Sequence, residues 1–243
     1  MDDNNVQRYK EKVSIGFHLR GGLDRTPEPP SVTEKVAKIL LDIKAISLSS
    51  KKPFKYTSGI LSPIYTDCRL LISFPKERRE IIKYYLDAIK SSKISVDVVA
   101  GTATAGIPWA SWIADFFNLP MIYVRGKTKE HGKRNQVEGL IKKGQNVVVI
   151  EDLISTGTSS IETAKAIRSV GASAPYVFSI MTYGLKKAED SFKQNNIKLI
   201  SLTNFQTVVD TAQKHNYINI KDQKMLLEWV KDPDSWGKNM GFN

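Results

Sequence analysis

The sequence predicts an α/β protein with a doubly wound, mainly parallel sheet flanked by helices and a small additional subdomain. Short apolar runs alternate with helical segments between residues 96 and 202, which is typical of parallel strands joined by helices. One of these runs, Val147–Ile150, precedes two carboxylates and a hydroxyl-rich loop, as expected of a buried strand that ends at a ligand site. A length of 243 residues, 41% of them hydrophobic, suffices for one such domain with an appendage.

Composition narrows the kinds of partner and compartment. A net charge of +11 and a pI near 9.5 suit an anionic partner, which could be a phosphorylated metabolite, a nucleic acid or a membrane surface. Cys68 is the single cysteine, so we expect no internal disulfide and no cysteine-rich metal site, and we place the protein in the cytoplasm. Glycine and proline interrupt the uncharged stretch 98–114, and residues 1–13 lack the apolar centre of a secretory leader. We therefore expect neither a membrane span nor export.

The chain divides at its proline cluster. Residues 1–31 form a polar tail that is either disordered or artificially added, whereas residues 32–237 form the domain. Within it we expect a small subdomain, called the hood below, from about 32–75 plus the C-terminal part, and a core from about 76–205.

Periodicity and turn residues predict the individual elements. A helix follows Ser31 and another begins at Pro75, and between them a hairpin joins 54–56 to 64–66 around Ser58–Gly59. The remaining expected elements are strands at 96–100, 121–124, 147–150, 176–180 and 199–202, and helices at 107–117, 159–170, 185–194, 207–215 and 222–231.

The loop after Val147–Ile150 carries the strongest functional signal. Its residues 155–159 would present backbone amides and hydroxyls at a helix N-terminus, which favours a phosphate. Gly157 would permit close approach, and Ser159 with Glu162 has the spacing of a capping box. An ordinary strand-to-helix turn would explain the glycine and the hydroxyls equally well. The two preceding carboxylates favour the ligand site, because such a pair can hold the hydroxyls of a sugar or the water shell of Mg²⁺.

Four segments together resemble one enzyme family. The apolar strand, acid pair and Thr/Ser–Gly–Thr loop resemble the phosphoribosyl pyrophosphate (PRPP) signature of type I phosphoribosyltransferases. Residues 54–69 and 123–132 resemble the hood and mobile-loop segments of the orotate phosphoribosyltransferase family, and residues 101–108 resemble its pyrophosphate-contacting loop. The resemblance covers about residues 32 to 237.

This resemblance implies a pentosyltransferase that converts orotate and PRPP to orotidine 5′-monophosphate and pyrophosphate, in de novo pyrimidine synthesis. It implies Lys129 and Asp152 as catalytic residues and Ser155 and Tyr65 as orotate contacts. It also implies Mg²⁺ carried on PRPP without direct protein ligands, and a homodimer whose mobile loop closes over the neighbouring site. The implied PRPP contacts are Thr104, Arg125, Lys127, Lys129, His131, Glu151, Asp152, Leu153, Ile154, Ser155, Thr156, Gly157, Thr158 and Ser159.

The chain departs from the family pattern at three cationic positions. Some members have Lys-Ser-Gly at 57–59, Tyr-Lys at 104–105, and near Tyr183 an arginine for the orotate carboxylate. Thr104, Lys127 and backbone amides would have to compensate, and Arg69 is a candidate for the carboxylate only if the fold brings it near. Two alternatives stay open: a PRPP-sensing regulator that binds nucleic acid, which an intact Lys129/His131 loop disfavours, and a phosphoribosyltransferase for another base.

Overall fold

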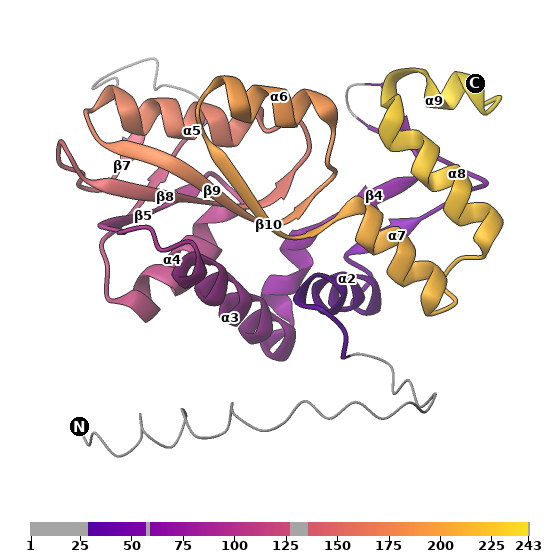
Figure 1. Ribbon diagram of the computed structural model, residues 1–243, viewed down its shortest axis with the longest axis horizontal. Helices are drawn as coiled ribbons and strands as arrows, with labels where there is room; N and C mark the ends of the chain where they lie inside the picture. The colour runs from indigo at the N-terminus through magenta and orange to yellow at the C-terminus, as the bar shows by residue number, and fades with distance from the viewer. Residues whose placement is uncertain (1–28, 57–58, 127–135, 243) are drawn as a thin grey trace, which may run out of the picture.

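The computed structural model describes residues 29–56, 59–126 and 136–242. Its main sheet has the strand order β10-β9-β8-β5-β6-β7, and all neighbouring strands are parallel except β6 and β7. Helices cover both faces of this sheet, as Figure 1 shows, so the predicted doubly wound architecture is confirmed. The strands are β5 Val98–Thr102, β6 Met121–Val124, β7 Val137–Glu138, β8 Asn146–Ile154, β9 Ser173–Thr182 and β10 Lys198–Asn204.

The strand order reverses between β5 and β8. From β5 the chain crosses to β6 on one side, whereas β8, β9 and β10 follow one another on the other side. The connections that leave the carboxyl ends of β5 and β8 therefore diverge. A crevice at such a switch point is where open α/β sheets bind their ligands.

Two apolar layers hold the helices on the sheet. Val147 and Val149 pack with α5 and α6, whereas Val148 and Ile150 belong to the core on the opposite face, as the alternation of side chains along a strand requires. Because both faces are covered, the first part of each central strand is a continuous apolar run, Val98–Ala100 in β5 and Val147–Ile150 in β8, and such runs are recognisable in the sequence. The helices are α5 Thr158–Ser169 and α6 Lys186–Gln194 on one face, and α2 Val32–Asp42, α3 Pro75–Ser91 and α4 Gly106–Phe117 on the other.

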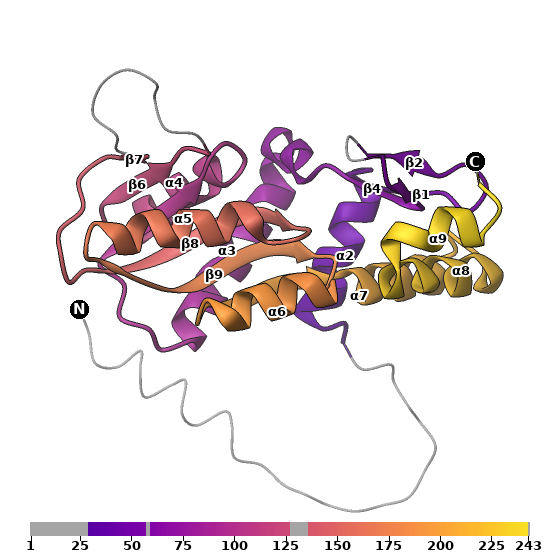
Figure 2. The ribbon, with the colours of Figure 1, turned by 90° about the horizontal axis from the view of Figure 1, so that it is seen from above.

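The smaller elements gather at one end of the main sheet (Figures 1 and 2). There the Trp229 indole N–H donates to the Leu61 carbonyl at 3.2 Å, joining a C-terminal helix to a strand of the hood. The division into hood and core stays a prediction. The elements are β1 Ile46–Leu48, β2 Phe54–Lys55, β3 Leu61–Ser62, β4 Ile64–Thr66, the 3₁₀ helix η1 Cys68–Ser73, α7 Phe205–Lys214, α8 Ile220–Lys231 and α9 Pro233–Asn239.

The hairpin of the hood differs from the expected pairing. β2 pairs with β3, whereas β4 pairs with β1, so the run Ile64–Thr66 is not the partner of residues 54–56. Pro63 separates β3 from β4, and a proline has no amide with which to continue a ladder. The sequence prediction also missed α9 and the short strands β1 and β7.

The predicted first helix is confirmed with its cap. The Ser31 hydroxyl accepts from the Glu34 amide, and the Glu34 carboxylate accepts from the Ser31 amide, which together make a capping box. No helix in the described part of the chain is long and apolar enough to cross a membrane. Residues 1–28 of the predicted tail lie outside the described residues.

Candidate active site at the switch point

The acid pair lies inside β8 rather than after it. Glu151 aligns with Ser179 of β9, and the ladder continues to Ile154, so the strand extends four residues beyond the end of the predicted run Val147–Ile150. Both carboxylates are therefore shielded: Glu151 is 5% and Asp152 9% exposed. Leu153 and Ile154 continue the strand, and the Ile154 side chain is buried, so only their backbone is suited to a PRPP contact.

The Glu151 side chain is tied to the helix that follows. Its Oε2 accepts from the hydroxyls of Ser159 at 3.2 Å and Ser160 at 3.1 Å, both in α5. Its backbone carbonyl accepts from the buried Tyr85 hydroxyl of α3 at 2.6 Å. One glutamate therefore connects β8 to the helices on both faces of the sheet.

Asp152 is held by the backbone beside it. Its Oδ1 accepts from the Leu153 amide at 2.7 Å. Burial raises the pKa of Asp152, and burial together with the neighbouring charge of Asp152 raises the pKa of Glu151 to about 8. Two adjacent buried carboxyls in this state gain most from ligands that donate hydrogen bonds, as sugar hydroxyls do, because such donors stabilise the ionised form.

The loop after β8 has the properties of a phosphate site. In the described residues, no hydrogen bond occupies the amides of residues 155–159, which lead into the N-terminus of α5. The hydroxyls of Thr156 and Thr158 lie 3.1 Å apart at the exposed edge of the loop. Free amides, hydroxyls and the positive end of the helix dipole thus converge on one spot.

Gly157 shapes this loop for two reasons. Its φ of +77° is in the left-handed region, and a Cβ at this position would lie 2.5 Å from the Phe192 ring of α6. Gly157 also provides the N-cap of α5, with no side-chain cap. The expected capping box of Ser159 and Glu162 is therefore wrong, since Ser159 bonds Glu151 and Glu162 pairs with Lys165.

Two further predicted segments end at the neighbouring strands. Gly101 of β5 aligns with Ile150 of β8, so the loop with the exposed Thr104 leaves the sheet beside the acid pair. Arg125 directly follows β6, and its Nε lies 2.9 Å from Oε1 of Glu138. The fold thus brings the acid pair, Thr104 and Arg125 to three adjacent strand ends. Lys127, Lys129 and His131 lie outside the described residues.

A cavity of about 500 Å³ opens on the β9 side of the phosphate loop. The turn that leaves β9 and the C-terminal helices form its walls together with the hood. Tyr65 is not among its lining residues; it is 44% exposed on β4 and packs against Phe54, so its contact with orotate stays a prediction. The lining residues are Tyr56, Ile60, Ser155, Thr156, Leu185, Lys186, Lys187, Trp229, Val230, Lys231, Asp232, Pro233 and Asp234.

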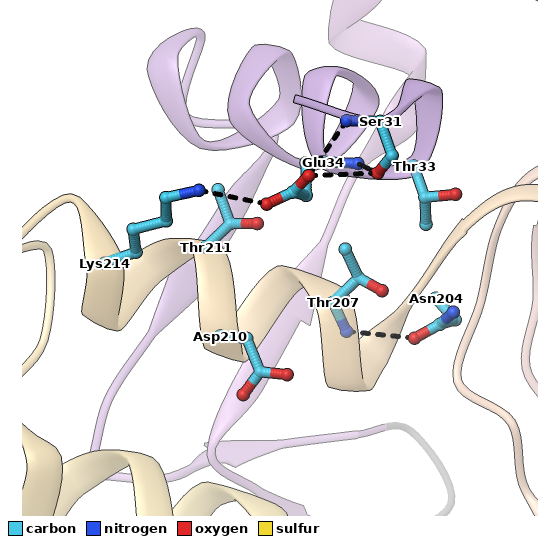
Figure 3. Close-up of a pocket in the computed structure, with 8 residues that line it drawn as sticks. All are labelled: Ser31, Thr33, Glu34, Asn204, Thr207, Asp210, Thr211 and Lys214. Atoms are coloured by element: carbon cyan, nitrogen blue, oxygen red, sulfur yellow. Dashed lines mark hydrogen bonds and ion pairs between the residues drawn. The ribbon is translucent and has the colours of Figure 1, made fainter. Parts of the chain in front are cut away.

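A second pocket, of about 440 Å³, lies between α2 and α7 (Figure 3). Its polar groups are already paired: Glu34 accepts from Lys214 at 3.1 Å, and Asn204 accepts from the Thr207 amide at 2.9 Å. Asp210 accepts from Gln206 and Gln223. These bonds cap and join helices, so the pocket is less suited to a substrate than the switch point.

Sequence reasoning missed two residues that support the site, Ser160 and Tyr85. The bond from Ser160 to Glu151 was not predicted, because the hydroxyls at the start of α5 were interpreted as phosphate donors or helix caps. Tyr85 is far from Glu151 in sequence, and no short motif links them. In the described residues, no cluster of three or more His, Cys, Asp or Glu side chains is suited to hold a metal ion.

Comparison with known proteins adds to this geometry. Residues 73–215 match the family model described as the phosphoribosyl transferase domain. The chain is 50% identical over 208 residues to the orotate phosphoribosyltransferase of Listeria monocytogenes serotype 4b (strain F2365), which covers 86% of this chain and 100% of that protein. It is 48% identical over 202 residues to that of Coxiella burnetii (strain RSA 493 / Nine Mile phase I), covering 83% and 97%. The solved orotate phosphoribosyltransferase from Aeropyrum pernix superposes with a TM-score of 0.66 at 29% identity, covering 76% of this chain and 99% of that one.

Proposed function

The chain belongs to the orotate phosphoribosyltransferase family, and we propose that its switch-point site transfers the 5-phosphoribosyl group of PRPP to orotate. The products are orotidine 5′-monophosphate and pyrophosphate, in de novo pyrimidine synthesis. The observation that carries this assignment to particular residues is the meeting of three features at adjacent strand ends. These are the buried acid pair of β8, the free amides of residues 155–159 and the Thr104 loop of β5.

The ribose phosphate occupies the β8 end of the site. The amides of residues 155–159 receive the 5′-phosphate, with the hydroxyls of Thr156 and Thr158 around it, since the Ser159 hydroxyl already donates to Glu151. Glu151 and Asp152 accept from the 2′- and 3′-hydroxyls of the ribose. Since both acids are buried at a fixed position on β8, they orient C1′ without reorganisation.

Pyrophosphate leaves toward β5 and β6. The bond between C1′ and the pyrophosphate oxygen breaks with its electron pair on oxygen, N1 of orotate forms the new bond to C1′, and the N1 proton is lost. Negative charge therefore grows on the leaving group, and cations and donors aimed at it accelerate the step. Thr104 and Arg125 lie on this side, and Lys127, Lys129 and His131 follow Arg125 in the chain. Lys129 is assigned the hydrogen bond to the departing oxygen.

In this proposal PRPP would carry Mg²⁺, and the ion would supply positive charge for the pyrophosphate. This fits the donor set, because Mg²⁺ usually keeps several waters and takes its other ligands largely from substrate phosphates, so it requires no cage of protein side chains. Asp152, beside the ribose, is suited to accept from its water shell. We further propose a homodimer in which residues 127–135 act on the neighbouring site, and a cytoplasmic location.

A single assay tests the reaction and its acceptor. Loss of orotate absorbance should depend on both PRPP and Mg²⁺, whereas uracil, hypoxanthine and adenine should give little product under the same conditions. Lys129→Ala should lose about 10²-fold or more in kcat, while Lys83→Ala, on the exposed face of α3, should retain full activity. Turnover of another base at a higher rate would overturn the orotate assignment, as would salt-sensitive nucleic-acid binding without turnover.

A further inference from the structure

The cavity beside the phosphate loop is placed to hold the acceptor base. The turn after β9 borders it because the Tyr183 amide donates to the Ile154 carbonyl at 2.9 Å, which keeps that turn against the end of β8. Ser155 and Thr156 form one wall, and the aromatic rings of Tyr56 and Trp229 contribute to another. A volume of about 500 Å³ accommodates a pyrimidine ring beside a ribose.

The chemistry of the transfer favours the same side. In a displacement at a sugar carbon that inverts its configuration, the incoming group attacks from the face opposite to the leaving group. Thr104 and Arg125, two of the groups assigned to pyrophosphate, follow β5 and β6, and β8 with the ribose site lies between these strands and β9. The acceptor therefore approaches from the β9 side, where the cavity lies.

Among the charged residues that line this cavity, Lys187 has the most available ammonium group. Lys186 pairs with Asp190 at 2.8 Å, and Lys231 pairs with Glu228 at 2.7 Å. Within the described chain, the Lys187 side chain has neither a hydrogen bond nor an ion pair. The acids of the cavity wall belong to the start of α9, where the Asp232 carboxylate accepts from the Ser235 amide.

Arg69 and Tyr183, the two other positions considered for the orotate carboxylate, do not supply a cation to this cavity. Arg69 makes two bonds to Asp67, from Nε at 2.6 Å and from an outer nitrogen at 2.9 Å, and it does not line the cavity. Tyr183 is 4% exposed, and its hydroxyl lies 3.2 Å from that of Tyr56. The start of α6 thus offers a cation four residues beyond Tyr183.

We propose that Lys187 binds the carboxylate of orotate and so selects orotate over uracil, which lacks this group. The inference rests on the proposed function. A lysine suits the position because its ammonium is a compact charge on a flexible stem, able to reach an anion from the rim of a cavity. Because Lys187 is exposed, the contact is screened and its contribution should weaken at high salt.

The test compares Lys187→Ala with Lys187→Arg and with Lys193→Ala, which removes an exposed lysine from the last turn of the same helix. We expect Lys187→Ala to raise the KM for orotate about fivefold, with kcat and the KM for PRPP within about twofold of the wild type. Lys187→Arg should restore most of the affinity for orotate. Residual turnover of uracil should be equal in the wild type and in Lys187→Ala.

Several outcomes would overturn the inference while leaving the proposed function intact. One is an unchanged KM for orotate in Lys187→Ala that folds with the wild-type melting temperature. Another is an equal rise of the KM values for orotate and PRPP, which would indicate a general effect on the site. A third is that Arg69→Ala, but not Lys187→Ala, raises the KM for orotate. Absence of orotate turnover by the wild-type protein would instead overturn the proposed function itself.

Discussion

The Glu151 carboxylate accepts from the Ser160 hydroxyl at 3.1 Å, so an acid of the proposed ribose site is fastened to the first turn of α5. The free amides of residues 155–159 belong to the connection between these two residues. The bond between Glu151 and Ser160 joins the two ends of the phosphate loop, so it fixes the distance between the acid pair and this loop. A ligand that carries a phosphate and two hydroxyls at matching separation meets both groups without rearranging them.

Asp152→Asn should weaken PRPP binding while leaving the fold intact. Asparagine has nearly the same volume, but it removes the charge that accepts from a ribose hydroxyl, and hydrogen bonds to charged groups contribute about 1.5–3 kcal/mol. We expect the KM for PRPP to rise about 10- to 100-fold, measured by steady-state kinetics at saturating orotate. Glu162→Gln is the control, because Glu162 is an exposed acid of α5 paired with Lys165. An unaffected KM for PRPP in Asp152→Asn would remove Asp152 from the ribose site.

Glu151 should make the free protein less stable at alkaline pH. Its pKa is raised to about 8 from 4.5, mainly by burial, so between these values the folded state binds a proton that the unfolded state has lost. Stability then falls as the pH rises through this window, and the full loss is reached above pH 8.

Glu151→Gln removes this titration and keeps a hydrogen-bond acceptor for Ser159 and Ser160. We expect the variant to exceed the wild type by roughly 2–4 kcal/mol in the free energy of unfolding at pH 9 and by much less at pH 5. Urea denaturation without ligand at both pH values measures the difference. Equal free energies of unfolding at pH 9 would show that Glu151 titrates normally.

Gly157→Ala should damage the phosphate loop through both its backbone and its packing. The φ of +77° costs a non-glycine residue about 1 kcal/mol, and the new Cβ would meet the Phe192 ring. The sum should lower the free energy of unfolding by about 2–4 kcal/mol and weaken PRPP binding. Gly144→Ala is the matched control, because Gly144 has a φ of +86° with nothing within 4 Å of a Cβ, so it should lose only the backbone part. If the two variants are equally stable, the Phe192 ring moves aside without cost and the packing part of this prediction is wrong.

The sequence could predict the core because its signals are local. Val147–Ile150 is apolar on both faces, since helices cover the sheet on both sides. Gly157 and the hydroxyl side chains on either side of it indicate the turn that follows. The order of strands, helices and loops thus followed from periodicity and turn residues. The resemblance of four separate segments then identified the family.

What could not be predicted depends on contacts between distant residues. The pairing of β4 with β1 rather than with β2 joins segments separated by the whole hairpin. The Ser160 and Tyr85 bonds to Glu151 arise only when α5 and α3 pack on the sheet. The cavity beside Lys187 likewise forms only when α8 and α9 pack near the phosphate loop. No sequence motif in either helix predicts this packing.

Tyr183 shows how the surroundings of one position limit an inference drawn from resemblance. Some family members have an arginine near this position for the orotate carboxylate, but here the ring packs edge-on against Trp229, with centroids 5.4 Å apart, and is 4% exposed. Burial raises the pKa of the Tyr183 hydroxyl, which indicates a site that disfavours charge.

Tyr183→Arg should therefore destabilise the protein by about 3 kcal/mol or more, because it buries a cation without a carboxylate partner, and it should not improve orotate affinity. Tyr183→Phe should cost about 1 kcal/mol, since it keeps the buried ring and loses the hydroxyl that bonds Tyr56. Urea denaturation followed by tryptophan fluorescence compares both variants with the wild type. A stable Tyr183→Arg protein with a lowered KM for orotate would show that the hood can open to admit the charge, and the carboxylate site would then lie at Tyr183 instead of Lys187.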